Sequence, residues 1–256
     1  MRKNELKMAP TINFYANFTA HRALGDVIAR AGEDILSTFV RIERSDAYRR
    51  DENGTSEATV RSGCYKFIPK EGLCGHLYQF LALKELIEAE RLFEQNAKYQ
   101  KADKPTYIEY SNCRKINFVD AGCGIGNIML IARIAGMVAN GIEYDPKLVR
   151  RAKKIHQYFY GYNSCGKGKV IQGDILKHRS WKNYDIVYFY CPMCNSKMEK
   201  KFEEKMEDEI KVGTFIVPHL KASSRFREDP RFARVALFDN NGFGISNGGI
   251  LRKVSQ

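Results

Sequence analysis

The chain has 256 residues and a formal net charge of +12, and 44% of its residues are hydrophobic. This composition is typical of a globular protein and excludes a wholly disordered chain. The sequence contains no run of about 18 apolar residues, so we expect no transmembrane helix. Because the charged N-terminal residues precede no apolar leader segment, we expect the seven cysteines to be free thiols in a reducing cytoplasm.

The first part of the chain is predicted to be an N-terminal helical extension over residues 1–60, ahead of a main domain at residues 61–256. Apolar residues recur at helical spacing within residues 20–49. Residues 59–69 are predicted to be extended. We interpret the extension as a packing segment, with a cap over the substrate or a helix that binds a partner as alternatives.

A long amphipathic helix is predicted at residues 75–95, because apolar side chains recur there at three- and four-residue spacing. Its stripe consists of Leu77, Phe80, Leu81, Leu83, Leu86, Ile87 and Leu92. We expect this helix to lie on a sheet just before the first strand of the main domain. The polar residues 97–112 should then form a loop over the ligand-binding edge.

The stretch at residues 116–126 organises the main domain. It reads INFVDAGCGIG, which is a short apolar strand, an acid and three glycines at alternate positions, and a helix is expected at residues 128–135. A strand, a glycine loop and a helix direct backbone N–H groups toward a ligand. Glycine is needed where a Cβ would hold that ligand away from the backbone. A dinucleotide pattern requires a third glycine at position 127, which is Asn127 here.

Two more predicted strands lead into acids. Residues 137–142 precede Glu143, which stands about 20 residues past the first glycine, where an acid can accept hydrogen bonds from ribose hydroxyls. A helix is expected at residues 146–158, and the next strand leads into Asp174. Together with Asp120 these acids would line the carboxyl edge of a parallel sheet, where open α/β sheets bind ligands. The alternative is that all three are ordinary loop acids.

The remaining predicted elements continue the alternation of strands and helices. They are a strand at 185–190, a helix at 195–210, and strands at 211–218, 232–238 and 243–254. Asn240, Asn241 and Gly242 indicate a hairpin between the last two strands. This order predicts an α/β fold with a doubly wound, mostly parallel sheet whose last strand is antiparallel.

The pattern Asp120-x-Gly122-x-Gly124-x-Gly126 resembles motif I of the class I S-adenosylmethionine (SAM) methyltransferases. This resemblance implies a seven-stranded sheet and SAM as the cofactor. It also implies that Asp120 meets the ammonium group of the cofactor, Asp174 its adenine amino group, and that Ile175 covers the ring. The predicted cofactor-binding residues are Asp120, Gly122, Cys123, Gly124, Gly126, Asn127, Glu143, Tyr144, Asp174 and Ile175.

The loop after the fourth strand faces the reactive methyl group in that family. Here it reads Tyr190-Cys191-Pro192-Met193. It lacks the Asp/Asn-Pro-Pro-Tyr/Phe motif of enzymes that methylate amino groups of nucleic acids. It also reverses the Pro-Cys order of cytosine-C5 enzymes, so we assign no covalent mechanism.

Residues 112–220 resemble the small seven-strand protein lysine methyltransferases. This resemblance implies that Tyr188 and Tyr190 line a channel for a neutral amine, with Pro192 as the third predicted catalytic position. One or both tyrosines could instead be core aromatics. We predict a cytoplasmic SAM-dependent methyltransferase with a protein substrate. A nucleic-acid substrate, suggested by the basic charge, and a SAM-binding protein without catalysis are the alternatives.

Cys191 and Cys194 have the spacing of half a zinc site or of a redox pair. Cys64 and Cys74 are too widely spaced to complete a usual zinc knuckle, so we treat the pair as a coincidence and predict no metal. Basic runs at residues 147–154 and 166–169 are interpreted as solvated faces, although such clusters also suit phosphate contacts.

Overall fold

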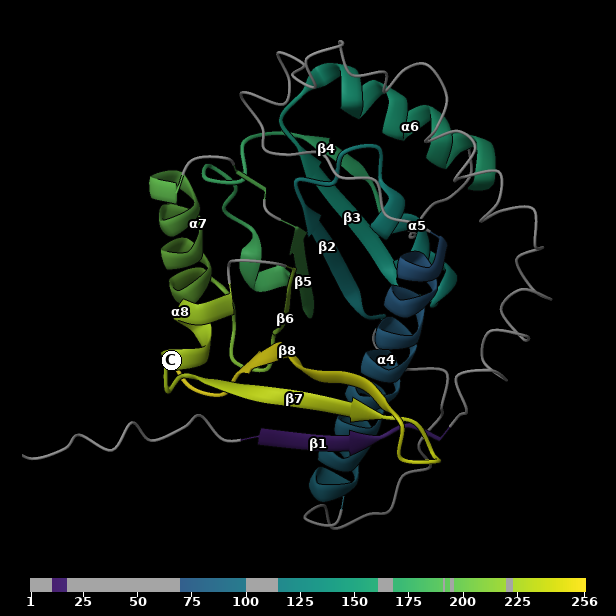
Figure 1. Cartoon of the computed structure of the whole chain (residues 1–256), viewed down its shortest axis with the longest axis vertical. Coiled ribbons are helices and arrows are strands. Elements are labelled where there is room, and N and C mark those ends of the chain that lie inside the picture. The colour runs from purple at the N-terminus through teal and green to yellow at the C-terminus, as the bar shows by residue number, and fades with distance from the viewer. Residues whose placement is uncertain are drawn as a thin grey trace, which may run out of the picture.

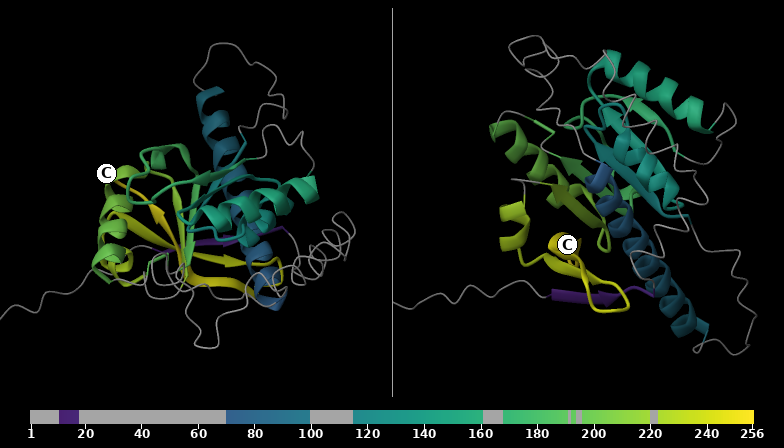
Figure 2. Two further views of the ribbon diagram at one scale, coloured as in Figure 1. Left: turned by 90° about the horizontal axis from the view of Figure 1, so that it is seen from above. Right: turned by 45° about the vertical axis from the view of Figure 1, so that its right-hand side comes forward.

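The computed structural model describes residues 11–17, 70–99, 115–160, 168–190, 192–193, 196–219 and 223–256. These residues form one sheet with helices on both of its faces (Figures 1 and 2). Within these ranges, no helix combines the length and the apolar character needed to cross a bilayer. The predictions for residues 20–49 and 59–69, and those for Cys64, Cys191 and Cys194, lie outside the described residues.

The sheet has the predicted doubly wound arrangement. Its strand order is β1-β7-β8-β6-β5-β2-β3-β4. The five central strands are parallel: β2 (Asn117–Ala121), β3 (Val138–Glu143), β4 (Val170–Gln172), β5 (Ile186–Tyr190) and β6 (Phe215–His219). The middle strands β2 and β5 are almost entirely buried, as apolar strands covered by helices on both faces should be.

The sheet ends in the predicted hairpin, with one additional strand. β8 (Gly244–Lys253) runs antiparallel to both β6 and β7 (Phe232–Phe238). The turn between them is held by Asp239, whose Oδ1 accepts the N–H groups of Asn241 and Phe243, each at 2.9 Å. Beyond β7 lies β1 (Thr11–Tyr15), which pairs with it in parallel and makes an eighth strand.

Strand β1 corrects the prediction of a helical extension at this part of residues 1–60. Its sequence TINFY alternates between exposed and half-buried positions, so it presents only one face to the protein. A single five-residue strand at a sheet edge carries too short an alternation to stand out ahead of a longer helical pattern. The predicted boundary at residue 60 remains a prediction.

The helices divide between the two faces. On one face, α4 (Lys70–Tyr99), α5 (Asn127–Ile134) and α6 (Pro146–Tyr160) contribute to one hydrophobic cluster. On the other face, η3 (Trp181–Asn183), α7 (Ser196–Glu209) and α8 (Ser223–Glu228) share a second cluster. Helix α4 extends through Tyr99, so residues 97–99 are helical and not loop. The short helix α8 was not predicted, because its segment reads as polar and basic.

Asp185, the residue before β5, ties α4 to the sheet. Its Oδ2 accepts the N–H of Asn117 at 2.9 Å and pairs with Arg91 at 3.0 Å. Its Oδ1 accepts a hydrogen bond from Lys211 Nζ at 2.7 Å. Burial acts to raise the pKa of this carboxyl, but these hydrogen bonds and positive charges outweigh it and hold the pKa below its usual value. Asp185 is therefore ionised at neutral pH, and the contacts that depend on its charge persist there.

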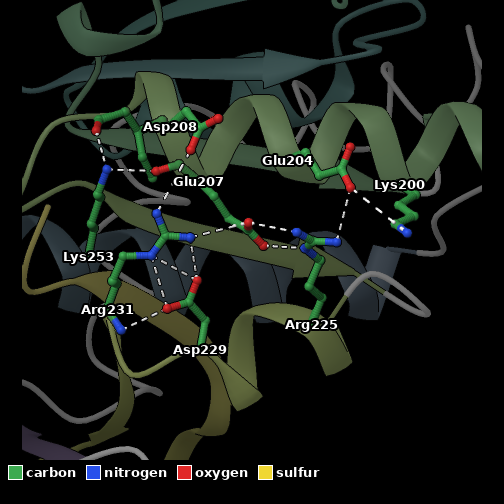
Figure 3. Close-up of polar contacts among 9 residues, drawn as sticks. Lys200, Glu204, Glu207, Asp208, Arg225, Asp229, Arg231 and Lys253 are labelled. Carbon is green, nitrogen blue, oxygen red and sulfur yellow. Dashed lines mark hydrogen bonds and ion pairs between the residues drawn. The ribbon is translucent and has the colours of Figure 1, made fainter.

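A polar network fastens α7 to the C-terminal part of the sheet (Figure 3). Glu207 accepts hydrogen bonds from Arg225 through both carboxylate oxygens and a further one from Arg231 at 3.3 Å. Lys253 is 1% exposed, and its Nζ donates to the carbonyls of Glu207 at 2.7 Å and Ile210 at 3.0 Å. A cation at the C-terminal end of α7 complements the helix dipole and satisfies carbonyls that have no partner within the helix.

Replacing Lys253 by Met should therefore destabilise the protein. The variant Lys253→Met keeps the apolar stem but leaves two buried carbonyls without their donor, which costs about 1–3 kcal/mol. Chemical unfolding would measure this loss. Lys201→Met, on the exposed side of the same helix, is the matched control and should change stability by less than about 0.5 kcal/mol. Equal stabilities for the two variants would contradict the role given to Lys253.

Candidate cofactor-binding site

The glycine loop between β2 and α5 has a backbone that only glycine adopts readily. Gly122, Gly124 and Gly126 have φ angles of 83°, 55° and 87°. The N–H groups of Gly122 and Cys123 both donate to the carbonyl of Ile142, at 2.8 and 3.1 Å. The loop is thus folded back against the end of β3, and Gly126 caps the N-terminus of α5. Gly122 is exposed at this edge of the sheet, whereas Gly124 and Gly126 are buried.

The three predicted acids follow three neighbouring parallel strands. Asp120 lies in β2 and Glu143 ends the adjacent β3 (Figure 1). Asp174 comes two residues after β4, the next strand. Asp174 is half-buried, and its Oδ1 accepts the N–H of Leu176 at 2.9 Å in a tight turn. The predicted placement along one sheet edge is confirmed, while the ligand contact of each acid stays a prediction.

Glu143 joins the glycine loop to the turn before α6. Its Oε2 accepts the N–H of Gly124 at 2.9 Å, and its Oε1 accepts the N–H of Asp145 at 2.8 Å. Each carboxylate oxygen has a second lone pair, so both can still accept a hydrogen bond from a ligand hydroxyl. The orientation of the carboxylate is thus fixed by protein N–H groups in advance of any ligand.

Asp120 and Glu143 are each 4% exposed, and no described Lys or Arg forms an ion pair with either. Burial raises the pKa of Asp120 well above its usual value, and the neighbouring Glu143 raises it further. Burial also raises the pKa of Glu143, although its backbone hydrogen bonds counter part of the effect. A cationic ligand group beside Asp120 would relieve this cost, because it favours the ionised carboxylate.

His156 supports the glycine loop from α6. Its ring is 5% exposed, and Nε2 lies 3.1 Å from the carbonyl oxygen of Gly126. A Cβ at position 126 would lie 2.4 Å from this nitrogen, so only glycine fits there. Burial, reinforced by the charge of Arg133, lowers the pKa of His156 to about 4. The imidazole is therefore neutral at physiological pH and donates its Nε2 proton to the loop.

The other predicted cofactor residues occupy different environments. Cys123 is buried, and burial, followed by the two neighbouring acids, raises the pKa of its thiol, so it stays protonated. Asn127 is buried at the first position of α5, and Ile175 is buried in the second hydrophobic cluster. Tyr144 is 57% exposed and follows directly after Glu143. Cys123, Tyr144 and Ile175 lie in the loops beside the three acids, and Asn127 begins the helix that follows the glycine loop.

Tyr188 is a core residue. Its side chain is 1% exposed, its ring packs edge-on against His76 and Phe80, and its hydroxyl lies 3.4 Å from His76 Nε2. The prediction that Tyr188 lines an open channel is therefore corrected, and the alternative, a core aromatic, is supported. The physical reason is that α4 lies over this face of β5 and places His76 against the tyrosine.

The other two predicted catalytic positions lie nearer to the glycine loop. Tyr190 is partly buried at the end of β5 and packs against the same hydrophobic cluster as Tyr188, on the sheet face predicted for both. Pro192 is buried, and its Cβ lies 3.1 Å from the position of a Cβ built on Gly122. The end of β5 thus meets the loop. Within the described ranges, no three His, Cys, Asp or Glu side chains are grouped to hold a metal ion.

Comparison with known proteins finds a partial similarity to a methyltransferase. No protein-family model matches the chain. A human protein, the lysine N-methyltransferase of an ATP synthase subunit, is 30% identical over 114 residues, which cover 44% of this chain and 48% of that protein. The chain thus spans about half the length of the curated relative it matches. Over the matched segment the chain is similar to that methyltransferase.

The solved structures that resemble this chain belong to proteins with different activities. An RNA methyltransferase from Salinibacter ruber in complex with S-adenosyl-L-homocysteine is 25% identical, with a TM-score of 0.35 over 40% of this chain and 63% of that one. The glycopeptide N-methyltransferase MtfA complexed with SAM is 10% identical, with a TM-score of 0.36 over 42% of this chain and 45% of that chain.

Two histidines that pack around the site were missed from the sequence. His76 lies on α4 and His156 on α6, and no role was predicted for either. His156 falls on the buried side of an amphipathic helix, where a core histidine and a loop-supporting one look alike. No spacing rule connects it with Gly126, because the contact forms only when α6 packs beside α5.

Replacing Gly126 by Ala should destabilise the protein more than the same change at Gly242. Both residues have positive φ, 87° and 81°, so each variant incurs backbone strain of about 1 kcal/mol. A Cβ at Gly242 meets nothing within 4 Å, whereas a Cβ at Gly126 overlaps His156. This overlap should add about 1–3 kcal/mol. Thermal or urea unfolding of both variants measures the difference, and equal losses would contradict the packing of His156 against the loop.

Proposed function

We propose that this protein is a class I SAM-dependent methyltransferase, and that it transfers a methyl group from SAM to a lysine-type amine of a protein substrate. The observation that carries the proposal is the pair of buried carboxyls, Asp120 and Glu143, beside three glycines with positive φ. Support for a protein acceptor comes from the 30% identity to a lysine N-methyltransferase.

The residues present fit the cofactor. The exposed Gly122 has no side chain to hold a ligand away from the backbone, Asp120 suits an ammonium group, and Glu143 has lone pairs left for hydroxyls. Asp174 and Ile175 follow β4. There Asp174 would contact the adenine amino group and Ile175 would cover the adenine ring. When bound, SAM supplies an electrophilic methyl group on its sulfonium sulfur.

The acceptor side of the site is formed by the end of β5. Pro192 lies against the glycine loop, and Tyr190 stands two residues before it. A lysine amine must lose its proton and its water before it can attack a methyl group. A partly buried aromatic side chain beside the loop favours the neutral amine and holds it in line. We therefore retain Tyr190 and Pro192 as positioning residues and omit Tyr188.

A nucleic-acid acceptor is the second candidate, because the chain carries a net charge of +12. The absence of an Asp/Asn-Pro-Pro motif after β5 argues against methylation of a base amino group. One experiment distinguishes the candidates. The protein is incubated with radiolabelled SAM and a cell lysate, and the products are treated with protease or nuclease. Label removed by protease supports the proposal, and label removed by nuclease supports the second candidate. Cofactor binding with no transferred label would indicate a binding protein without catalysis.

Replacing Glu143 by Gln should weaken cofactor binding. The variant Glu143→Gln retains the shape of the side chain, but it loses charged hydrogen bonds to the ligand and turns its amide NH2 toward one of the two backbone N–H donors, which together cost at least about 1–3 kcal/mol. Calorimetry with S-adenosylhomocysteine would measure this as a roughly 5- to 150-fold increase in Kd. Glu228→Gln on α8 is an exposed control that should leave Kd unchanged. An unchanged Kd for Glu143→Gln would remove Glu143 from the site.

Binding of the same ligand should release a proton from Asp120. The pKa of Asp120 is raised in the free protein, by burial first and then by Glu143, so ionising it costs folded-state stability as the pH rises above about 4. The ligand's ammonium group favours the ionised form, so affinity should increase with pH through that raised pKa. Calorimetry in buffers of different ionisation enthalpy would detect the proton. Asp120→Asn should abolish its release, and unchanged release in that variant would contradict the assignment.

A further inference from the structure

Positive charge is concentrated in one part of the chain. Residues 146–160 and 168–182 contain nine Lys or Arg residues and one acid, Asp174. The nine are Lys147, Arg150, Arg151, Lys153, Lys154, Lys169, Lys177, Arg179 and Lys182. This part therefore supplies a net +8 of the chain's +12. By contrast, α7 carries four lysines and six acids.

A cavity of about 700 Å³ gathers positive side chains from three elements. It is lined by Lys177 and Arg179 from the loop after β4, Lys182 from η3, Lys205 and Glu209 from α7, and Leu176. We call it the η3–α7 cavity. Lys205 pairs with Glu209, the single acid of the lining. Lys177, Arg179 and Lys182 are exposed and form no ion pair with the described part of the chain, so their three charges are not neutralised there.

The η3–α7 cavity is separate from the cofactor site but linked to it by a turn. None of its six lining residues belongs to the glycine loop or to the end of β5. Its wall begins at Leu176, whose N–H donates to Asp174 Oδ1, and the N–H of Lys177 donates to the Asp174 carbonyl at 2.9 Å. Both η3 and α7 contribute to the second hydrophobic cluster, on the sheet face opposite α4, α5 and α6.

We propose that the η3–α7 cavity binds phosphate esters, so that the protein docks on nucleic-acid backbone outside its cofactor site. The planar guanidinium of Arg179 matches two phosphate oxygens at once, and Lys177 and Lys182 add point charges. The volume is in the range of sites that hold nucleotide-sized groups. Closely spaced phosphodiesters also match three converging cations better than the more widely spaced carboxylates of an acidic peptide. Docking at this cavity does not depend on the methyl acceptor or on the proposed function.

The proposal is tested by measuring RNA binding in the absence of cofactor. The probe is a fluorescently labelled single-stranded RNA of mixed sequence, and its binding is monitored by fluorescence anisotropy. Lys177→Glu/Lys182→Glu should weaken binding by at least about tenfold at moderate salt and should reduce the salt dependence, because about two phosphate contacts are lost. Both side chains are exposed, so the variant should fold, as circular dichroism would check.

Lys147→Glu/Lys154→Glu is the matched control. It makes the same change of net charge in a second basic cavity, of about 610 Å³, whose described lining comes from α6 alone. This control should weaken RNA binding by less than about threefold, through long-range electrostatics alone. If the control loses as much binding as the cavity variant, or if the cavity variant loses none, the η3–α7 cavity is not the site.

Competitors identify the source of the phosphate. Displacement of the RNA by unlabelled RNA alone supports docking on nucleic acid, and displacement by ATP as well supports the same phosphate site with free nucleotides as further ligands. Competition by polyglutamate at equal charge would overturn the proposal, because the cavity would then respond to negative charge in general and fit an acidic protein. A failure here leaves the SAM and methyl-transfer measurements unaffected, so the two proposals fail separately.

Discussion

The hydrogen bond from the Gly124 N–H to the Glu143 carboxylate is the contact on which the rest of the site depends. It joins the glycine loop after β2 to the end of β3, the neighbouring parallel strand. The same carboxylate also accepts the N–H of Asp145, so the turn into α6 is fixed with it. Helix α6 in turn carries His156, whose Nε2 forms a hydrogen bond with the carbonyl of Gly126. The loop is thus held from both ends by polar contacts that need neither a ligand nor a loop side chain.

The central part of this arrangement was predictable because its causes are local in sequence. Three glycines at alternate positions, an acid after each of three apolar strands, and a proline at the start of α6 each follow from the requirements of a strand–loop–helix unit. The register of β2 and β3 then brings the acids together without further information. For the same reason a doubly wound, mostly parallel sheet could be predicted before any contact was known.

The parts that could not be predicted depend on contacts between distant segments. Tyr188 alternates correctly with Tyr190, but only the packing of α4, with His76, decides that it is buried. His156 reaches Gly126 across two helices. Strand β1 is too short for its pattern to be distinctive, and α8 consists of polar and basic residues whose helical state depends on burying Phe226. In each case a tertiary contact overrides or completes a weak local preference.

The charges of the protein are separated in space, and this separation has a physical basis. Acids whose burial is costly lie at the carboxyl edge of the central strands, where a cation can compensate them. The acids of α7 and the arginines that follow it neutralise one another in the network around Glu207. The excess of positive charge is left on α6 and on the segment between β4 and η3, outside both of these regions.

Strand β1 also has a consequence for how the chain folds. It pairs in parallel with residues 234–238, which come after almost all of the other described elements. On the ribosome this strand is made early but finds its partner only when synthesis has reached β7, so its edge position must be filled late. Once paired, it covers the backbone of β7 that would otherwise be open to strands of other molecules. Aggregation during synthesis should therefore be governed by the interval between the emergence of β7 and the arrival of β1.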